Sequence, residues 1–289
     1  MSIILDNVRY TYNPNSPFES HALKDVSIEI KEHEFIGLIG HTGSGKSTLV
    51  QMLNALLHPT SGKIAVDGLD TSKNSKDLKK IRQLVGLVFQ YPEYQLFEET
   101  IEKDIAFGPS NLGLSEEEIK VRVKEAMELV GLDYDNLKDQ SPFDLSGGQK
   151  RRVAIASVIA MRPKYLILDE PTAGLDPAGR DSILSEIKNF YDINKDVTVI
   201  IVSHSMEDIA KLANRVIVMH QGQLFADASP REVYSMDDKL EEIGLDVPQI
   251  TKAMKLLEKK GYKFDKTVLT VEEALEEILN QKGGTQDGE

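Results

Sequence analysis

A glycine-rich stretch, Gly40-His41-Thr42-Gly43-Ser44-Gly45-Lys46-Ser47-Thr48, has the residue types and spacing of a phosphate site. It fits G-x-x-x-x-G-K-[ST], the Walker A pattern. Glycines allow the backbone to turn tightly, so that successive N–H groups point at one anion. Lys46 would then reach the β- and γ-phosphates, and the Ser47 hydroxyl would bind Mg²⁺. We expect all nine residues, Gly40, His41, Thr42, Gly43, Ser44, Gly45, Lys46, Ser47 and Thr48, to bind ATP.

Two acidic residues end a short hydrophobic run, Tyr165-Leu166-Ile167-Leu168-Asp169-Glu170. A carboxylate at the end of a core strand beside a phosphate loop can hold Mg²⁺, most often through water, and Asp169 fits this role. Glu170 fits the general base that orients and deprotonates the attacking water. An acidic turn after a strand is common, but with the Walker A stretch upstream the pair indicates nucleotide hydrolysis.

A second glycine-containing stretch, Ser146-Gly147-Gly148-Gln149, opens a helix whose first turns carry basic residues. The free N–H groups of that helix and the Ser146 hydroxyl would make a second anion site, whereas in isolation the stretch suggests only an N-cap serine and a turn. Basic residues oppose the dipole of a first helical turn, which slightly favours a phosphate site. One nucleotide hardly needs two such loops, so we expect a dimer in which each chain's second loop covers the other chain's nucleotide.

The elements that position these motifs alternate between strand and helix. Phe35–Ile39 is predicted as a buried strand, and 48–57 as the helix after the Walker A loop. Residues 166–168 and 197–202 are β-branched or apolar throughout, as in a parallel sheet covered on both faces, and a helix at 178–191 would complete a βαβ unit. Further strands are predicted at 3–12, 23–30, 63–68 and 84–89, a hairpin at 215–219 and 223–226, and helices within 100–131 and 150–161.

Composition narrows the class of protein. The 289 residues, 40% of them hydrophobic, suit one large domain with an appendage, or two domains. No apolar run approaches the ~18 residues of a membrane helix, and the acidic start makes a signal peptide unexpected. The absence of cysteine excludes disulfides and thiolate metal sites, and agrees with a reducing cytosol. A net charge of −13 argues against unaided binding to nucleic acid or anionic lipid, so a membrane role would need a protein partner.

The ordered motifs resemble those of an ABC-type ATPase cassette and cover residues 1 to about 228. They are the Walker A loop, Gln90, the signature Leu145-Ser146-Gly147-Gly148-Gln149, the Walker B strand ending at Asp169, Glu170, the loop Ala173-Gly174-Leu175-Asp176, and His204. The resemblance implies an α/β fold: a RecA-like P-loop core, an antiparallel β subdomain and a helical signature subdomain at about 92–160.

The resemblance also implies roles. Gln90 would sense Mg²⁺ and the transmembrane partner, Asp176 would link the two sites across the dimer, and His204 would contact the γ-phosphate. An aromatic residue near the N-terminus would stack on adenine; Tyr12 is the first candidate and Tyr10 the competitor. Taken alone, His204 suggests a strand-end histidine and Gln90 a solvated loop residue. The residues expected to take part in catalysis are therefore Glu170, His204 and Gln90. Those expected to hold Mg²⁺ are Ser47, Gln90 and Asp169. Those expected to contact the ATP of the partner chain are Ser146, Gly147, Gly148, Gln149 and Asp176.

Residues 89–97 and 104–109 are more specifically similar to the ATPase subunits of energy-coupling factor transporters, importers of vitamins and metal ions. The residues at 40–43 and 169–176 resemble those of the second, A-prime, type of ATPase subunit. The resemblance implies a second ATPase subunit (a non-identical paralogue, or another copy of this chain), a transmembrane coupling subunit and a substrate-binding membrane subunit. The resemblance also implies that the chain lies peripherally on the cytoplasmic face of a bacterial membrane. It would not insert into the membrane and would have no nucleic-acid partner. Aromatic and acidic residues within 91–99 would hold a short basic helix of a membrane partner, or form a solvated acidic loop.

Beyond Pro230 the sequence changes to short, charged, amphipathic helices with turns at Gly244 and Gly261. We predict a small α-rich domain of the dimerisation type at 229–282, with 271–279 packing between subunits, and a flexible tail at 283–289.

Other function classes fit less well. The alternative that the chain is the ATPase of another ABC importer class stays open. A soluble ABC protein of DNA repair would need a long coiled coil between Walker A and signature, and translation types usually carry two cassettes. A P-loop kinase or GTPase leaves the signature and His204 unexplained, and a non-catalytic ATP-binding scaffold does not need Glu170.

Overall fold

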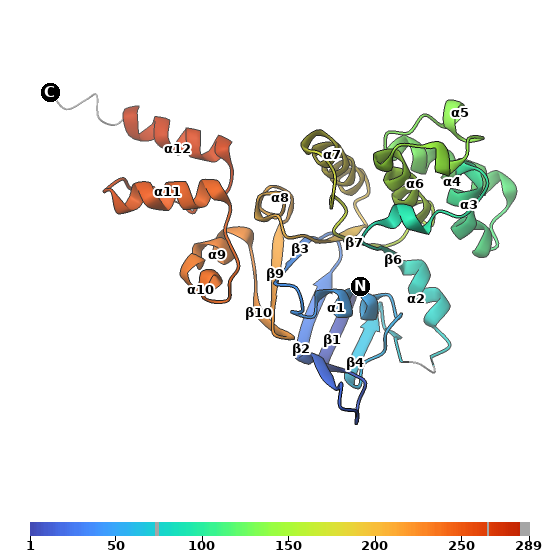
Figure 1. Ribbon diagram of the computed structural model, residues 1–289, viewed down its shortest axis with the longest axis horizontal. Coiled ribbons are helices and arrows are strands. Elements are labelled where there is room, and N and C mark those ends of the chain that lie inside the picture. The colour runs from blue at the N-terminus through green and yellow to red at the C-terminus, as the bar shows by residue number, and fades with distance from the viewer. Residues whose placement is uncertain (73–74, 265, 284–289) are drawn as a thin grey trace.

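The computed structural model describes residues 1–72, 75–264 and 266–283 (Figure 1). Its central sheet confirms the predicted parallel core: β3, β6, β7, β8 and β9 run parallel, and only β10 at one edge is antiparallel. In the described part of the chain this sheet has six strands, in the order β10 (Gln223–Ala228), β9 (Arg215–His220), β3 (Phe35–Ile39), β8 (Thr198–Val202), β7 (Tyr165–Asp169) and β6 (Val85–Val88).

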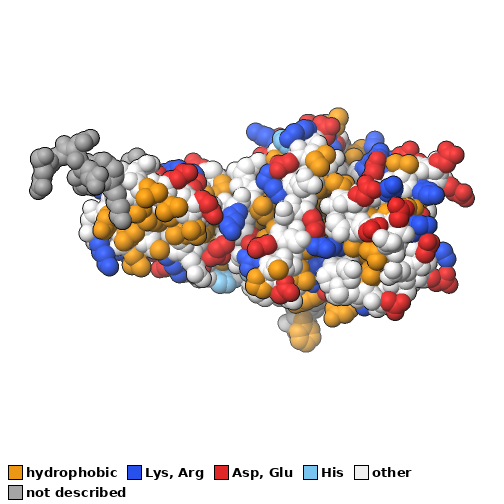
Figure 2. All heavy atoms as spheres, turned by 90° about the horizontal axis from the view of Figure 1, so that it is seen from above, with side chains coloured by type: hydrophobic (Ala, Val, Ile, Leu, Met, Phe, Trp, Pro, Cys, Tyr) orange, Lys and Arg blue, Asp and Glu red, His pale blue; other side chains and the backbone are white. Residues whose placement is uncertain are grey.

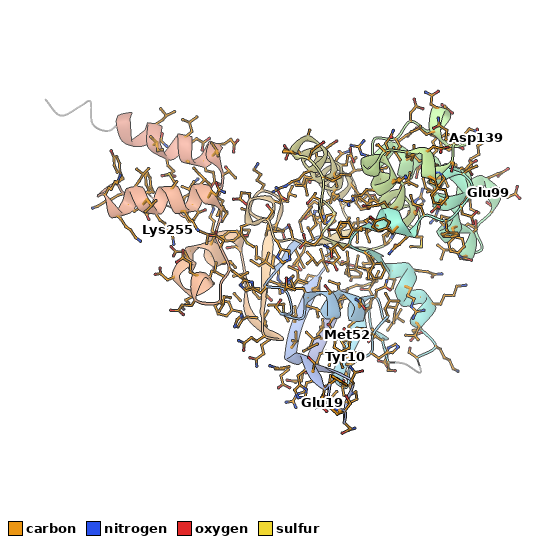
Figure 3. The ribbon with its side chains drawn as sticks, in the orientation of Figure 1. Tyr10, Glu19, Met52, Glu99, Asp139 and Lys255 are labelled. Atoms are coloured by element: carbon orange, nitrogen blue, oxygen red, sulfur yellow. The ribbon has the colours of Figure 1, made fainter. Side chains whose placement is uncertain are left out.

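The predicted antiparallel subdomain is a second sheet beside α1 (Lys46–Leu53). Its strand order is β2 (Ser20–Lys31), β1 (Ser2–Tyr12), β4 (Ser61–Val66) and β5 (Leu69–Asp70). The apolar faces of this sheet, of α1 and of the central sheet share one core, in which Met52 is fully buried and Tyr10 partly buried (Figure 3). The helix that follows the Walker A loop is therefore held between the two sheets.

The helical signature subdomain lies on the other face of the central sheet, at the opposite end of the molecule from the C-terminal helices (Figure 1). Hydroxyl side chains start two of its long helices: Thr100 and Ser115 accept hydrogen bonds from N–H groups of the first turns of α3 and α4. The subdomain consists of the short 3₁₀ turns Pro92–Gln95 and Pro142–Asp144 and the helices α3 (Ile101–Asn111), α4 (Glu116–Leu129), α5 (Tyr134–Leu137) and α6 (Gly147–Ile159).

Three further helices cover the central sheet: α2 (Leu78–Leu84), α7 (Pro177–Ile193) and α8 (Met206–Leu212). The α7 helix completes the predicted βαβ unit between β7 and β8. The helix predicted at 48–57 starts earlier, at Lys46, and stops at Leu53. It stops there because the Asn54 side chain donates to the Val85 carbonyl and Ala55 has φ 56°.

The C-terminal region contains α9 (Pro230–Ser235), α10 (Asp237–Glu242), α11 (Gln249–Lys259) and α12 (Val271–Gly283). The turns at Gly244 and Gly261 are where the sequence predicts them, at φ 72° and 100°. Side chains of α9 and α10 belong to the same core as the signature subdomain, whereas α11 and α12 pack around a small core of their own. Of the predicted tail 283–289, Gly283 ends α12 and 284–289 lie outside the described residues. Among the residues described, none of the helices has the length and apolar character needed to cross a membrane.

Candidate nucleotide site

The Walker A loop connects the carboxyl end of β3 to the start of α1. Its lysine is nearly buried, and Lys46 Nζ donates to the carbonyls of Gly40 (2.5 Å) and His41 (3.0 Å), so the loop closes around its own side chain. Gly40 has φ 150°, and a Cβ there would lie 2.3 Å from the Met219 carbonyl oxygen. The backbone therefore approaches β9 as closely as only glycine permits.

A cavity of about 400 Å³ lies over this loop. Its wall brings together most of the predicted site residues: Tyr12, Thr42, Gly43, Gly45, Lys46, Ser47, Thr48, Gln90, Asp169, Glu170 and His204. Four lining residues were not predicted, namely Ser20, His21, Ala22 and Val202. The volume is within the range of ligand pockets, roughly 300–1,000 Å³.

Three Walker A residues that were expected to bind ATP do not line the cavity. Gly40 and Ser44 are buried beneath the loop. His41 is exposed and points toward the C-terminal helices, where a Cβ on Gly244 would lie 2.7 Å from its Nε2. The ring of His41 thus packs directly on the turn between α10 and α11.

The two acids at the end of β7 are in the same cavity. Burial raises the pKa of Asp169, and the Lys46 charge and a hydrogen bond from Ser47 oppose the rise. Burial also raises the pKa of Glu170 to about 7, with a further contribution from the negative charge of Asp169. Glu170 has φ 52°, a strained conformation for a residue with a side chain, held by the bond from its N–H to the Val202 carbonyl (3.0 Å).

His204 follows β8 and faces Glu170. Its Nε2 lies 3.3 Å from Glu170 Oε1, but the contact lacks hydrogen-bond geometry, and among the described residues this buried oxygen has no hydrogen-bond partner. Burial lowers the pKa of His204 below its usual value, and the positive charges of Lys46 and His41 lower it further. The imidazole is therefore neutral at neutral pH.

The residues present fit ATP and Mg²⁺. Ser44 Oγ and Glu170 Oε1 are buried polar atoms without a partner in the described chain, as expected for groups that serve a ligand. The Ser47 hydroxyl and the Asp169 carboxylate are the oxygen donors Mg²⁺ prefers. The described residues include no group of three or more acids or histidines that could hold a metal, so phosphate oxygens and water would complete the coordination.

Tyr12, not Tyr10, lies on the cavity wall. Its hydroxyl is 3.2 Å from Thr48 Oγ1, and its ring is partly exposed. Tyr10 packs edge-on against Tyr12, with ring centroids 4.7 Å apart, and contributes to the core.

The signature residues are outside this chain's own cavity. Ser146 caps α6, and its side chain and that of Gln149 form a capping box, which explains why the helix begins at Gly147 rather than at Lys150. A Cβ on Gly147 or Gly148 would meet no atom within 4 Å among those described. Asp176 is exposed and caps α7 by accepting from the Gly179 N–H (2.6 Å).

A larger groove of about 710 Å³ lies between α2, the 3₁₀ turn at Pro92–Gln95, α3 and α6, and Lys79 and Arg82 of α2 line one side of it. Exposed Phe97 and Phe107 line it and pack edge to face, 4.9 Å apart. Asp104 fixes the loop by accepting from the Phe97 and Glu98 N–H groups, both at 2.9 Å.

Glu93, expected among the acids available to a partner, is engaged within the chain. Its carboxylate accepts two hydrogen bonds from the buried Arg151 (2.8 and 3.2 Å), whose other amino group donates to the carbonyls of Pro171 and Ala173. This part of the expectation was wrong, because the sequence does not show that Arg151 turns inward.

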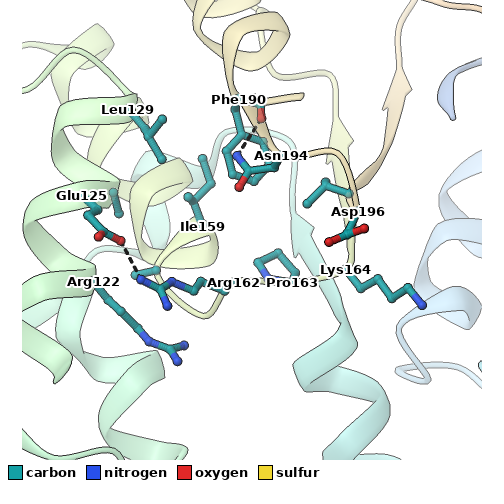
Figure 4. A pocket seen from close by; sticks show the side chains of 13 residues that line it. Arg122, Glu125, Leu129, Ile159, Arg162, Pro163, Lys164, Phe190, Asn194 and Asp196 are labelled. Carbon is teal, nitrogen blue, oxygen red and sulfur yellow. Dashed lines mark hydrogen bonds and ion pairs between the residues drawn. The ribbon is translucent and has the colours of Figure 1, made fainter. Parts of the chain in front are cut away.

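Another cavity, of about 260 Å³, lies between α4, α6 and α7 (Figure 4). Its three cations are already paired: Arg122 with Glu118 (2.8 Å), Arg162 with Glu125 (2.7 Å), and Lys164 with Asp67 (2.9 Å) and Glu32 (2.6 Å). These pairs make it a weaker candidate for an anionic ligand than the Walker A cavity.

Comparisons with known proteins agree with this geometry. A family model described as "ABC transporter" matches residues 23–173. The "Energy-coupling factor transporter ATP-binding protein EcfA2" of Clostridium tetani is 59% identical over 96% of this chain and 96% of that protein. The EcfA2 protein of Caldanaerobacter subterraneus is 58% identical over 99% of this chain and 100% of its own length.

Two solved structures are similar as well. One is cbiO1 of Clostridium perfringens, described as part of the ABC transporter complex cbiONQ, with a TM-score of 0.73 and 37% identity over 88% of this chain and 98% of that chain. The other is a dimeric ATP-binding cassette in a post-hydrolysis state with ADP and Pi, with a TM-score of 0.69 and 31% identity over 79% of this chain and 99% of that chain.

Proposed function

We propose a function for this chain, which belongs to the ABC transporter family. It is the ATP-binding subunit of an energy-coupling factor transporter. In that role it powers the uptake of vitamins or metal ions through membrane partners. The observation that carries the proposal is that Lys46, Asp169, Glu170 and His204 line one cavity over the Walker A loop.

The Walker A residues and Tyr12 bind ATP. Backbone N–H groups at the start of α1 and the Lys46 ammonium bind the phosphates, and the Tyr12 ring at the cavity wall stacks on adenine. Mg²⁺ held by Ser47, Gln90 and Asp169, partly through water, would neutralise charge that develops on the phosphate oxygens.

Hydrolysis needs a base and a contact to the γ-phosphate. Glu170 takes a proton from water as the water oxygen bonds to the γ-phosphorus and the bond to the ADP oxygen breaks. Its unpartnered Oε1 is available for that proton, and its raised pKa makes it a stronger base than an exposed carboxylate. Neutral His204 donates a hydrogen bond to the γ-phosphate, and Gln90 on the cavity wall senses Mg²⁺ and the transmembrane partner.

A second cassette completes the site. Ser146, Gly147, Gly148 and Gln149 present an open helix start, and we assign them to the γ-phosphate of a partner's ATP, with Asp176 linking the two sites. ATP then stabilises the closed dimer, and hydrolysis reopens it. The second subunit is a non-identical paralogue or another copy of this chain.

The groove around Phe97 and Phe107 receives a short helix of the transmembrane coupling subunit. It is apolar along its floor, and Glu98 lies beside it for a basic residue of that helix, whereas Glu99 is paired with Lys103 (2.8 Å) within the chain. A substrate-binding membrane subunit completes the complex. The chain is then peripheral on the cytoplasmic face of the membrane, and its acidic charge gives no basis for a nucleic-acid partner.

Residues 229–282 contribute to subunit pairing. The space-filling view shows apolar side chains over the end of the molecule formed by α11 and α12 (Figure 2). The exposed apolar residues there are Leu256, Tyr262, Val271, Leu275 and Leu279. A patch of this kind marks an interface.

Isolation of the chain from its native membrane in detergent tests the function. The expected result is co-purification with a second ATPase, a coupling subunit and a substrate-binding subunit, and ATP hydrolysis by the assembly. A chain that hydrolyses ATP but carries no membrane protein would instead be a soluble ABC ATPase.

A further inference from the structure

We propose that Arg180 is a positioning residue for ATP hydrolysis: it ties the loop that carries His204 to the turn that carries Asp176. The inference rests on the proposed function, which gives those two residues their roles. Arg180 lies in the first turn of α7, outside the residues that line the nucleotide cavity.

The guanidinium of Arg180 bridges two groups on α8. Its Nε donates to Asp208 Oδ2 (2.9 Å), and its Nη2 donates to Asp208 Oδ1 (2.6 Å). The same Nη2 also donates to the Ser205 hydroxyl. One planar side chain therefore fixes both the N-cap of α8 and a carboxylate in its first turn.

Ser205 directly follows His204, so its conformation fixes the backbone from which the imidazole projects. Its hydroxyl accepts from the Asp208 N–H (3.3 Å), and its own N–H donates to the Ser203 hydroxyl (3.0 Å). With the bond from Arg180, these contacts hold the backbone on the C-terminal side of His204 in one arrangement.

The other end of the connection is Asp176. The Arg180 N–H donates to the Asp176 carbonyl (2.9 Å), which closes the first turn of α7, and the Asp176 side chain caps the same turn. A displacement of Asp176 by a partner subunit would thus carry Arg180 with it. Because Arg180 holds Ser205, the displacement reaches His204 and, 3.3 Å beyond, Glu170.

Burial makes this link stiff. The Asp208 side chain is only 7% exposed, and a buried carboxylate needs a matched, hydrogen-bonded partner. A lysine at position 180 would supply charge but not a planar fork that reaches Asp208 and Ser205 together.

Arg215 provides a matched control. It also forms a two-pronged pair with an aspartate, Asp227 of β10 (2.7 Å for both bonds), and its Nη1 pairs with Glu34 and donates to the Glu29 carbonyl of β2, but it contacts neither catalytic loop. Its replacement by lysine tests the loss of an Arg–carboxylate pair without any effect on His204.

The experiment measures kcat and KM for MgATP and the affinity for ADP in the full-length chain assembled with its membrane partners. Arg180→Lys is expected to lower kcat about 10- to 100-fold, the usual cost of a misplaced catalytic group, while KM, ADP affinity and the melting temperature stay as in Arg215→Lys. In a His204→Ala background, Arg180→Lys should cost little more, because both changes remove the same contribution.

Arg180→Gln with Asp208→Asn removes both charges together and leaves no unpaired buried charge, so it serves if the lysine variant folds poorly; the same loss of kcat is expected. Equal kcat in Arg180→Lys and Arg215→Lys overturns the inference. So does a loss that persists undiminished in the His204→Ala background. Wild-type assembly that fails to hydrolyse ATP overturns the proposed function itself, whereas active wild type with an unaffected Arg180→Lys overturns only this inference.

Discussion

His204 Nε2 and Glu170 Oε1 lie 3.3 Å apart, although their residues are 34 positions apart in the sequence (204 − 170). The two residues follow the neighbouring parallel strands β8 and β7, whose carboxyl ends meet at one edge of the sheet. The fold therefore places the proposed base beside the proposed γ-phosphate contact.

Glu170→Gln should lower ATP hydrolysis about 10²–10⁴-fold, the usual contribution of a general base. ATP affinity should remain, because the Walker A loop is unchanged. Steady-state hydrolysis and nucleotide titration measure the two quantities, with Glu128→Gln on exposed α4 as the control. Hydrolysis at the wild-type rate would remove Glu170 from the role of base.

Gly148→Ala tests the contact in trans. In the chain itself the added Cβ has open space, and alanine favours a helix over glycine, so the melting temperature should not fall. If Gly148 faces a partner's phosphate, hydrolysis should drop about 10- to 100-fold because the γ-phosphate is displaced. Glu117→Ala, in the first turn of α4, is the control. Unchanged hydrolysis would mean that no nucleotide approaches this helix start.

Phe97→Ser with Phe107→Ser tests the docking groove. The two exposed rings form its apolar edge, so their loss should reduce recovery of the coupling subunit in detergent while ATP binding by the isolated chain is retained. Phe143→Ser, which removes an exposed ring elsewhere in the signature subdomain, should have no effect on recovery. Equal recovery for both would place the membrane partner on another surface.

Leu275→Glu tests the apolar surface of α12. Leu275 is 58% exposed, so a charge there should leave the fold intact but weaken subunit pairing, as measured by sedimentation of the full-length chain with its second ATPase subunit. Val121→Glu, an exposed site on α4, is the comparison. Undisturbed pairing would show that these helices do not lie between subunits.

Glu273→Gln tests the attachment of α12 to α9. Burial alone would raise the pKa of Glu273, but hydrogen bonds from Arg231 and from the Leu269 N–H outweigh it and hold the pKa below the usual 4.5. A depressed carboxyl pKa adds stability above about pH 4.5, and this stability is lost as pH falls through the folded-state value.

At pH 7 the free energy of unfolding of the variant should therefore be about 1 kcal/mol lower than that of wild type, and this difference should narrow below about pH 4.5. Thermal unfolding at several pH values measures this, with Glu276→Gln as the exposed control. A difference that does not depend on pH would assign the effect to packing rather than charge.

Local patterns predict what local contacts decide. The strand Phe35–Ile39 has the predicted bounds because five consecutive buried residues leave little choice of structure. The end of α1 depends on the bond from Asn54 to Val85, a residue brought near only by the fold. Likewise α8 has only seven residues and was not predicted, since such a segment is too short to show a helical period.

The choice between Tyr10 and Tyr12 shows the same limit within the site. In a regular strand residues two apart share a face, so alternation places both rings together. Register shifts between Val8 and Tyr10 and between Tyr10 and Thr11 break that alternation. The motifs likewise gave no signal for His21 and Ala22, which join the cavity wall only because β2 of the other sheet passes the Walker A loop.

The contact of His41 with Gly244 limits how the C-terminal helices can be exchanged. Any side chain at position 244 would meet the imidazole at 2.7 Å and would also have to adopt φ 72°. A chimera that carries residues 229–283 from a relative should therefore fold onto this cassette most stably if it keeps glycine at 244; any other side chain there is strained at φ 72°, and the exposed His41 ring has to turn aside for it.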